Sequence, residues 1–175
     1  MLEMMILGFL ADSPLHGYEL RQKMAQLHGY ARTVSDGALY PAIRRLQEAG
    51  HLEATDEEGR GAASRRTLRL TDSGRALLRE RLSTADGTAV SDQSRFFVVL
   101  AFLSHLPDPA ARRAVLERRL AFLEGARSFF TEGGSPQRLA EIADPYRRGM
   151  MTVARAASRA EIAWLREQLG SEESP

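Results

Sequence analysis

The sequence predicts a mainly α-helical protein with one small β ribbon, and three observations predict it. Apolar residues recur three or four positions apart, the helical spacing, through most of the 175 residues. The spacing changes to two over residues 51–55 and 65–71, which is the period of a β-strand. Only 7% of the residues are aromatic while 43% are hydrophobic, a composition that favours a packed helical core over an aromatic-rich sandwich.

Two short helices are expected within the first 27 residues. Each carries three apolar residues at helical spacing, which are Met4, Leu7 and Leu10 in the first and Leu20, Met24 and Leu27 in the second. The first helix stops at the turn-forming residues Asp12-Ser13-Pro14, because proline interrupts helical hydrogen bonding.

A third helix is expected between Ser35, a residue type that caps helix starts, and Gly50, which suits the left-handed position after a helix end. Its buried side would hold Leu39, Ile43 and Leu46, and its outward side Tyr40, Arg44, Arg45 and Gln47. Pro41 fits either the first turn, where proline costs nothing, or the helix interior, where it bends the axis. The sequence leaves both positions open.

A ribbon and a fourth helix complete the first part of the chain. The two strands place Leu52 with Ala54, and Leu68 with Leu70, on one side each. The loop between them is long and polar, so it predicts an extended ribbon tip and not a tight hairpin. Thr71 followed by Asp72 then offers a cap and a first-turn acid for a helix that contains Leu78 and Leu82.

We expect a first domain over residues 1–82, a linker over 83–92, a helical dimerisation domain over 93–170 and a flexible tail over 171–175. The small polar residues after Leu82 mark the linker. Three helices are expected beyond it, over 93–106, 110–130 and 145–169. The last has a heptad-like seam suited to a partner helix, at Tyr146, Met150, Val153, Ala157, Ala160 and Trp164.

Composition and motifs argue against several function classes. The chain has no cysteine, and its four histidines show no metal-ligand spacing, so we expect no metal and no cofactor. It has no glycine-rich phosphate loop and no motif for nucleophilic catalysis, so we expect no enzyme. The N-terminus lacks the features of a signal peptide, and the apolar run 96–103 falls far short of the roughly 20 residues that span a bilayer. We therefore expect a cytoplasmic protein without a membrane anchor.

The predicted element order of the first part is that of a winged helix-turn-helix, in which the third helix enters the DNA major groove and the ribbon touches the backbone. Four stretches carry a closer resemblance: His16-Gly17-Tyr18-Glu19-Leu20, the run from Gly37 to Gly50, Arg65-Arg66, and the run from Leu70 to Arg75. These stretches resemble the PadR family of bacterial transcriptional regulators. The second part resembles, by pattern, the virulence-activator-type C-terminal domain of its longer members.

The resemblance implies a homodimeric transcriptional regulator, usually a repressor, with a dimer made by the C-terminal helices and DNA release often controlled by a small aromatic or hydrophobic effector. By position, Tyr18, Ser35, Tyr40 and Arg44 match residues on the DNA face, and Arg65 and Arg66 match basic residues of the wing. One departure is that Thr67 and Leu68 stand where family members often have aromatic residues.

The residue types agree with binding to double-stranded DNA. Phosphate contacts need arginines, hydroxyl donors and helix N-terminal amides, and Arg44 or Arg45 is long enough to pair with guanine. The full set of expected DNA-binding residues is Tyr18, Ser35, Gly37, Ala38, Tyr40, Pro41, Arg44, Arg45, Arg60, Arg65 and Arg66. The plainer alternatives are a solvated helix face for the two arginines and a core position for Tyr40.

An apolar effector site is expected among Phe97, Tyr146, Met150 and Trp164, because methionine and aromatic side chains adapt to flat ligands. The plainer alternative makes Trp164 an anchor of the dimer interface. For the whole protein, the competing hypothesis is a winged-helix dimer that acts as a protein-interaction adaptor. The near-neutral net charge of +1 and the acidic residues 56–58 favour it slightly, because the acidic residues repel phosphate and the net charge attracts it only weakly.

Overall fold

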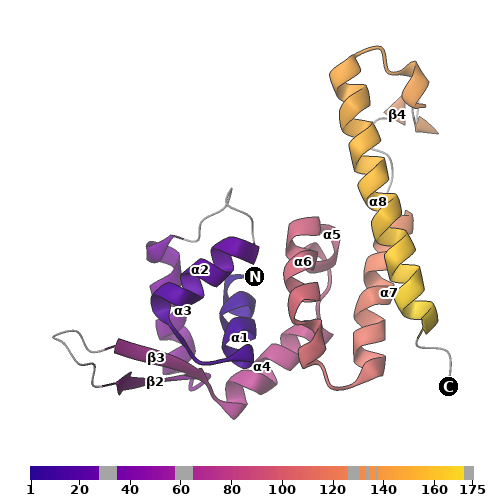
Figure 1. Ribbon diagram of the computed structural model, residues 1–175. Coiled ribbons are helices and arrows are strands. Elements are labelled where there is room, and N and C mark those ends of the chain that lie inside the picture. Colours follow the sequence, from indigo (N-terminus) through magenta and orange to yellow (C-terminus); the bar gives the residue numbers. More distant parts are fainter. Residues whose placement is uncertain (28–34, 58–64, 126–130, 133–134, 137, 172–175) are drawn as a thin grey trace. The chain divides into compact units, whose positions relative to one another are not determined.

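The computed structural model describes residues 1–171 except 28–34, 58–64, 126–130, 133–134 and 137 (Figure 1). The chain forms two compact units, Met1–Arg112 and Arg113–Pro175. Each unit is helical, and the described strands are short. The mainly α fold with a winged helix-turn-helix in its first part is therefore confirmed.

The four helices expected in the first part are present. They are α1 (Leu2–Asp12), α2 (Gly17–Leu27), α3 (Asp36–Glu48) and α4 (Asp72–Ser83). The apolar residues that predicted α1 and α3 are buried, as are Leu20 and Met24 of α2. The helical spacing thus identified the core side of each helix.

Helix α3 begins after Ser35 and is followed by Gly50, whose φ of 74° is the left-handed conformation that glycine adopts without strain. The side chain of Ser35 makes no capping hydrogen bond, so Ser35 occupies the cap position without bonding as a cap. Pro41 lies inside the helix, one turn beyond its start. The question that the sequence left open is therefore answered in favour of the interior position.

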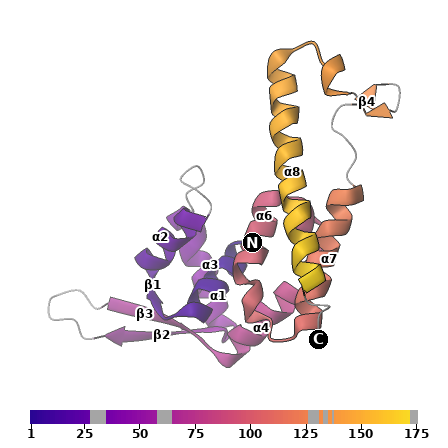
Figure 2. The ribbon, with the colours of Figure 1, turned by 45° about the vertical axis from the view of Figure 1, so that its right-hand side comes forward.

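The three-stranded antiparallel sheet has the order β1 (Leu15–His16), β3 (Arg65–Leu70), β2 (Leu52–Glu57) (Figure 2). Its register pairs Leu52 with Leu70 and Ala54 with Leu68, so the residues predicted to share a side of the ribbon face the same way. The sequence predicted the two long strands and missed β1. A two-residue strand is too short to show an alternating pattern.

Thr71 caps α4 as predicted. Its hydroxyl accepts a hydrogen bond from the Gly74 amide at 3.0 Å and donates one to the carbonyl of Gly50 at 2.8 Å. A side chain at Gly74 would collide with the carbonyl oxygen of His51. The start of α4 is therefore packed against the turn that ends α3.

Helices α5 (Thr88–Ser91) and α6 (Gln93–Phe102) and the short helix η1 (Leu103–His105) continue the first unit. Phe102 of α6 is buried and contacts Phe9 of α1 edge to face, with ring centroids 5.0 Å apart. His105 lies 3.0 Å from the carboxylate of Asp12. The compact unit extends to Arg112. Helix α6 packs on α1, and residues 88–91, which were expected in a linker, are helical. The expected domain boundaries stay a prediction.

The second unit contains most of α7 (Pro109–Gly125) and all of α8 (Pro145–Ser171). Between them lie a two-stranded ribbon of β4 (Thr131–Glu132) and β5 (Ser135–Pro136), which the sequence did not predict, and η2 (Leu139–Glu141). The expected end of α7 at residues 126–130 lies outside the described residues. The core of the second unit is formed by Val115, Leu116, Ile142, Met151, Leu165 and Leu169. No helix in the described part of the chain is long and apolar enough to cross a membrane.

Candidate nucleic-acid interface

A hollow of about 360 Å³ lies in the first unit between the start of α2, one side of α3 and the sheet. Its lining residues are His16, Gly17, Tyr18, Tyr40, Ile43, Gln47, Arg66 and Leu68. Tyr18, Tyr40 and Arg66 come from three different elements and were all expected to contact DNA. The fold therefore brings together two hydroxyl groups and one guanidinium that sequence alone could only group by resemblance.

The position of Tyr18 follows from how α2 begins. The amide of His16 donates a hydrogen bond to Glu19 Oε2 at 2.8 Å, which ties the first turn of α2 to β1. The His16 ring stacks on the Tyr18 ring, with centroids 6.4 Å apart and planes 9° apart. Tyr18 is 57% exposed, and its hydroxyl donates a long hydrogen bond of 3.4 Å to Glu19 Oε1.

Tyr40 lies against the backbone of Gly17. A Cβ at residue 17 would stand 3.3 Å from Tyr40 Cε1, which is a tight contact. Tyr40 is 48% exposed and is therefore not a core tyrosine. Glycine at residue 17 thus allows the ring from α3 to approach α2 closely, and the tyrosine remains accessible.

The exposed side of α3 is divided between Arg44 and Arg45. Successive residues of an α-helix are rotated by about 100° around its axis, so the two side chains leave α3 in different directions. Arg44 is exposed and shares the Tyr40 side of the helix, because the two residues are four positions apart. Arg45 reaches the other way, and its Nη2 lies 3.4 Å from Glu3 Oε1 on α1. Arg45 therefore contacts α1, whereas Arg44 lies on the side of α3 that carries Tyr40.

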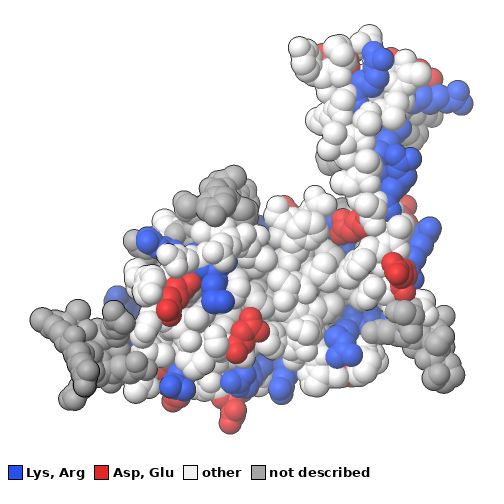
Figure 3. Space-filling model, viewed as in Figure 1, with Lys and Arg blue, Asp and Glu red and all other residues white. Residues whose placement is uncertain are grey.

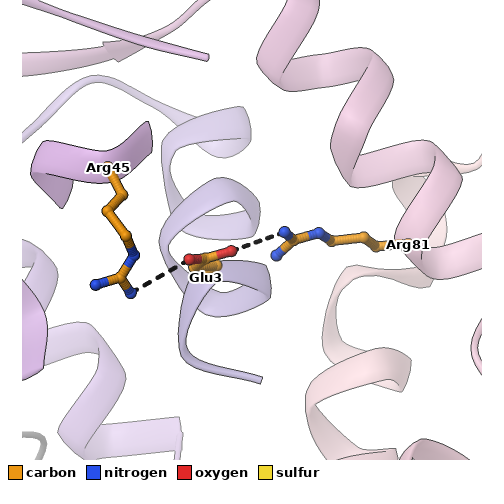
Figure 4. A network of polar contacts seen from close by, with 3 residues as sticks. All are labelled: Glu3, Arg45 and Arg81. Atoms are coloured by element: carbon orange, nitrogen blue, oxygen red, sulfur yellow. Dashed lines mark hydrogen bonds and ion pairs between the residues drawn. The ribbon is translucent and has the colours of Figure 1, made fainter. Parts of the chain in front are cut away.

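Glu3 is shared between two arginines (Figure 4). Its second carboxylate oxygen lies 2.7 Å from Nη2 of Arg81 on α4. Partial burial favours the neutral acid, but the hydrogen bonds and charges of Arg81 and Arg45 outweigh it and hold the pKa of Glu3 below its usual value. Glu3 is therefore ionised at neutral pH and links α1 to both α3 and α4.

The wing places acidic residues opposite its basic ones. In the register of the ribbon, Asp56 pairs with Arg66 and Glu57 with Arg65. Arg66 is exposed, whereas Arg60 and the side chain of Arg65 lie outside the described residues. Thr67 and Leu68 are both buried, and the Thr67 hydroxyl lies 3.3 Å from His16 Nδ1.

The remaining expected contacts occupy the start of α3. Ser35, Gly37, Ala38 and Pro41 are all exposed, and a Cβ at Gly37 would meet nothing within 4 Å. The surface at this point is open enough for another backbone to approach. In Figure 3, basic and acidic residues are interspersed over the visible face of this unit, so this face has no broad positive field.

The four residues expected at an effector site are all exposed. Phe97 lies on α6 of the first unit, and Tyr146, Met150 and Trp164 lie on α8 of the second, with 87%, 52% and 38% exposure for these last three. The effector site stays a prediction.

Among the described residues, no group of three or more histidine, aspartate or glutamate side chains is arranged to hold a metal ion.

Residues 6–80 match the model of the transcriptional regulator PadR-like family. Two curated relatives each match 43% of the chain. One is a transcriptional regulator of Mycobacterium tuberculosis, 43% identical over 75 residues, which are 43% of this chain and 66% of the relative. The other is an uncharacterised transposon protein of Streptomyces fradiae, 38% identical over 76 residues, which are 43% of this chain and 20% of the relative. The match thus spans less than two thirds of either relative's length.

Two of the similar solved structures extend over both units. PadR of Bacillus subtilis in complex with operator DNA is 19% identical, with a TM-score of 0.47 and coverage of 97% of each chain. The same protein in complex with p-coumaric acid is 19% identical, with a TM-score of 0.42 and coverage of 99% of each chain. A putative transcriptional regulator of Thermoplasma acidophilum is 24% identical, with a TM-score of 0.42, and covers 46% of this chain and 75% of that one.

Proposed function

We propose that this chain, whose residues 6–80 form a domain of the PadR-like family of transcriptional regulators, regulates transcription by binding specific DNA sequences. The observation that carries the proposal is the convergence of Tyr18, Tyr40 and Arg66 on one hollow beside the exposed side of α3. A recognition helix flanked by phosphate-binding groups is the arrangement that sequence-specific binding requires.

In this proposal α3 enters the major groove and Arg44 pairs with a guanine edge. The hydroxyls of Tyr18 and Tyr40 and the guanidinium of Arg66 bind phosphates of the adjoining backbone. The open start of α3, with Ser35, Gly37, Ala38 and Pro41, lets a phosphate approach the helix N-terminus, where the partial positive charge favours anions. The wing residues Arg60 and Arg65 add further phosphate contacts.

The proposed active form is a homodimer that binds an inverted-repeat operator as a repressor. The support is the apolar stripe on α8, where Tyr146, Met150 and Val153 are more than half exposed in the single chain. Exposed apolar side chains in a row mark an interaction surface. A two-fold dimer presents two recognition helices to half-sites about one helical turn apart.

Release from DNA by a small aromatic or hydrophobic effector is part of the same proposal. Such a ligand would act by binding one arrangement of the dimer better than the other. The side chains proposed to take part are Phe97, Tyr146, Met150 and Trp164. They are exposed aromatic and methionine side chains, which suit contact with a flat apolar ligand.

Selection of bound duplexes from a random pool, followed by gel shifts, tests the proposal. We expect one enriched inverted repeat, bound at least about a thousandfold more tightly than random DNA of equal length. Binding that is weak and equal on all sequences would overturn it. That result would favour the adaptor hypothesis, which the acidic residues opposite the wing arginines support.

A further inference from the structure

The ion-pair network around Glu3 reaches the recognition helix through Arg45, one of the residues expected from the sequence to bind DNA. Glu3 stands in the first turn of α1 and is 26% exposed. One carboxylate is thereby shared by two guanidinium groups, those of Arg45 on α3 and Arg81 on α4 (Figure 4). The network carries a net positive charge at the side of α3.

The two arginines are held unequally. Arg81 makes the shorter contact, 2.7 Å, and its side chain is 35% exposed. Arg45 makes a contact of 3.4 Å and is 60% exposed. A long, mostly solvated contact of this kind is weak, so a phosphate can compete with Glu3 for Arg45 more easily than for Arg81.

We propose that Glu3 is a positioning residue that holds Arg45 beside α3 and thereby limits the affinity for DNA that does not depend on sequence. The carboxylate draws the Arg45 guanidinium toward α1, and its negative charge repels a phosphate that approaches the same guanidinium. Arg44 keeps its freedom to reach a base edge. The ratio of specific to non-specific binding is then set partly by a residue that contacts no DNA, an inference that rests on the proposed function.

The test variant is Glu3→Gln, which keeps the shape of the side chain and removes its charge. Binding to a random duplex is measured by fluorescence anisotropy between 50 and 200 mM salt. We expect tighter binding of random DNA at low salt and a salt slope steeper by about 0.9, the value of one added phosphate contact. Over that fourfold salt range, this slope increases the loss of affinity by roughly three- to fourfold relative to the wild type.

Two controls distinguish the release of Arg45 from the change in the net charge of the protein. Glu80→Gln removes the same charge from an exposed position next to Arg81. It is expected to leave the salt slope unchanged. Arg45→Ala combined with Glu3→Gln is expected to abolish the added affinity, because the released guanidinium is then missing. An equal gain in Glu80→Gln, or a gain that persists without Arg45, would overturn the proposal.

A further pair of variants keeps the proposal testable should Glu3→Gln melt at a lower temperature than the wild type. Arg81→Ala leaves Glu3 to Arg45 alone, so random DNA is expected to bind more weakly than in Arg79→Ala, which removes an equal charge from an exposed position of α4. Equal or tighter binding in Arg81→Ala contradicts the role of Glu3. Absence of any DNA binding by the wild type contradicts the proposed function itself, which is a different result.

Discussion

Gly8 of α1 lies directly against the ring of Phe102 of α6, so closely that a Cβ at residue 8 would overlap the ring. Phe102 is buried and also packs edge to face on Phe9, with ring centroids 5.0 Å apart. Helix α6 is therefore part of the core that supports the recognition helix. The contact requires glycine for close approach and not for an unusual backbone conformation.

We predict that Gly8→Ala destabilises the protein by about 1–3 kcal/mol, the usual cost of overpacking a core. The ring of Phe102 is enclosed on its other sides and has little room to move. The measurement is the midpoint of urea unfolding.

Gly149→Ala is the matched control, because Gly149 lies in α8 and a Cβ there meets nothing within 4 Å. This control is expected to stabilise the protein by roughly 0.5–1 kcal/mol through helix propensity alone. A Gly8→Ala variant as stable as the control would contradict the tight packing of α6 on α1.

Much of this fold could be predicted from periodicity, because a buried helix side or strand side repeats at a fixed interval. The core positions of α1 and α3, and the shared side of Leu68 and Leu70 on the ribbon, follow from that rule. The element that packs on each apolar surface cannot be predicted from that rule. The sequence predicted a helix over 93–106, but a sequence period contains no information on which element covers its apolar side, and here α6 packs on α1.

The candidate site likewise has features that the sequence could predict and features that it could not. Sequence reasoning singled out Tyr18, Tyr40 and Arg66 through resemblance, and the structure adds that they share a hollow. Sequence reasoning could not distinguish Arg44 from Arg45, because only Arg45 forms an ion pair with Glu3, a residue more than 40 positions away. It also missed the buried Arg119, since an arginine within a helical pattern is ordinarily read as exposed.

We predict that Arg44→Ala and Arg66→Ala weaken DNA binding in different ways. Loss of a base contact by Arg44 should cost about 1–3 kcal/mol on the selected operator and relax the preference at one base pair. Loss of a phosphate contact by Arg66 should weaken all sequences alike and reduce the salt slope by about one unit. Competition assays with operator and random duplexes measure both, and equal losses on both duplexes for the two variants would contradict the assignment.

Arg119 and Glu161 form a bidentate ion pair between α7 and α8, with contacts of 2.7 and 2.9 Å and side-chain exposures of only 2% and 10%. We predict that Glu161→Ala destabilises the second unit by about 3–5 kcal/mol, because it removes the carboxylate that neutralises the buried Arg119 guanidinium. Chemical denaturation followed by circular dichroism measures the loss.

The control for that prediction is the exposed pair Arg166–Glu124, whose side chains are 65% and 44% exposed. Glu124→Ala should change stability by less than about 1 kcal/mol, since exposed pairs contribute little. Similar losses in the two variants would mean that burial does not determine the strength of the ion pair.

We predict that Ala157→Glu disrupts the homodimer. Ala157 is exposed on α8 and belongs to the apolar stripe with Met150 and Val153, so a carboxylate there would be buried without a partner when two stripes meet. Ala163→Glu introduces the same charge about 120° away around the helix and should leave the dimer intact. Sedimentation velocity measures the association. A dimer that persists in Ala157→Glu would show that another surface forms it.

The last prediction concerns Trp164, the only tryptophan of the chain, which is 38% exposed in the single chain and lies on the same stripe of α8. If the stripe forms the dimer interface, the indole loses water on association, and its emission maximum should move to shorter wavelength as the protein concentration rises. The shift should follow the sedimentation data and should be absent in Ala157→Glu.

The same signal tests the effector site in a concentration range where the dimer is complete. Aromatic compounds that bind at Trp164 should change its emission and release operator DNA at the same ligand concentration, because both effects report one binding equilibrium. In Trp164→Phe, operator binding should persist while its sensitivity to the compound weakens, since the smaller ring removes part of the contact. A compound that releases DNA equally well from the wild type and from Trp164→Phe would place the effector site away from this residue. An emission that never changes with concentration or ligand would also exclude Trp164 from the dimer interface, because an indole that leaves water cannot keep the spectrum of an exposed one.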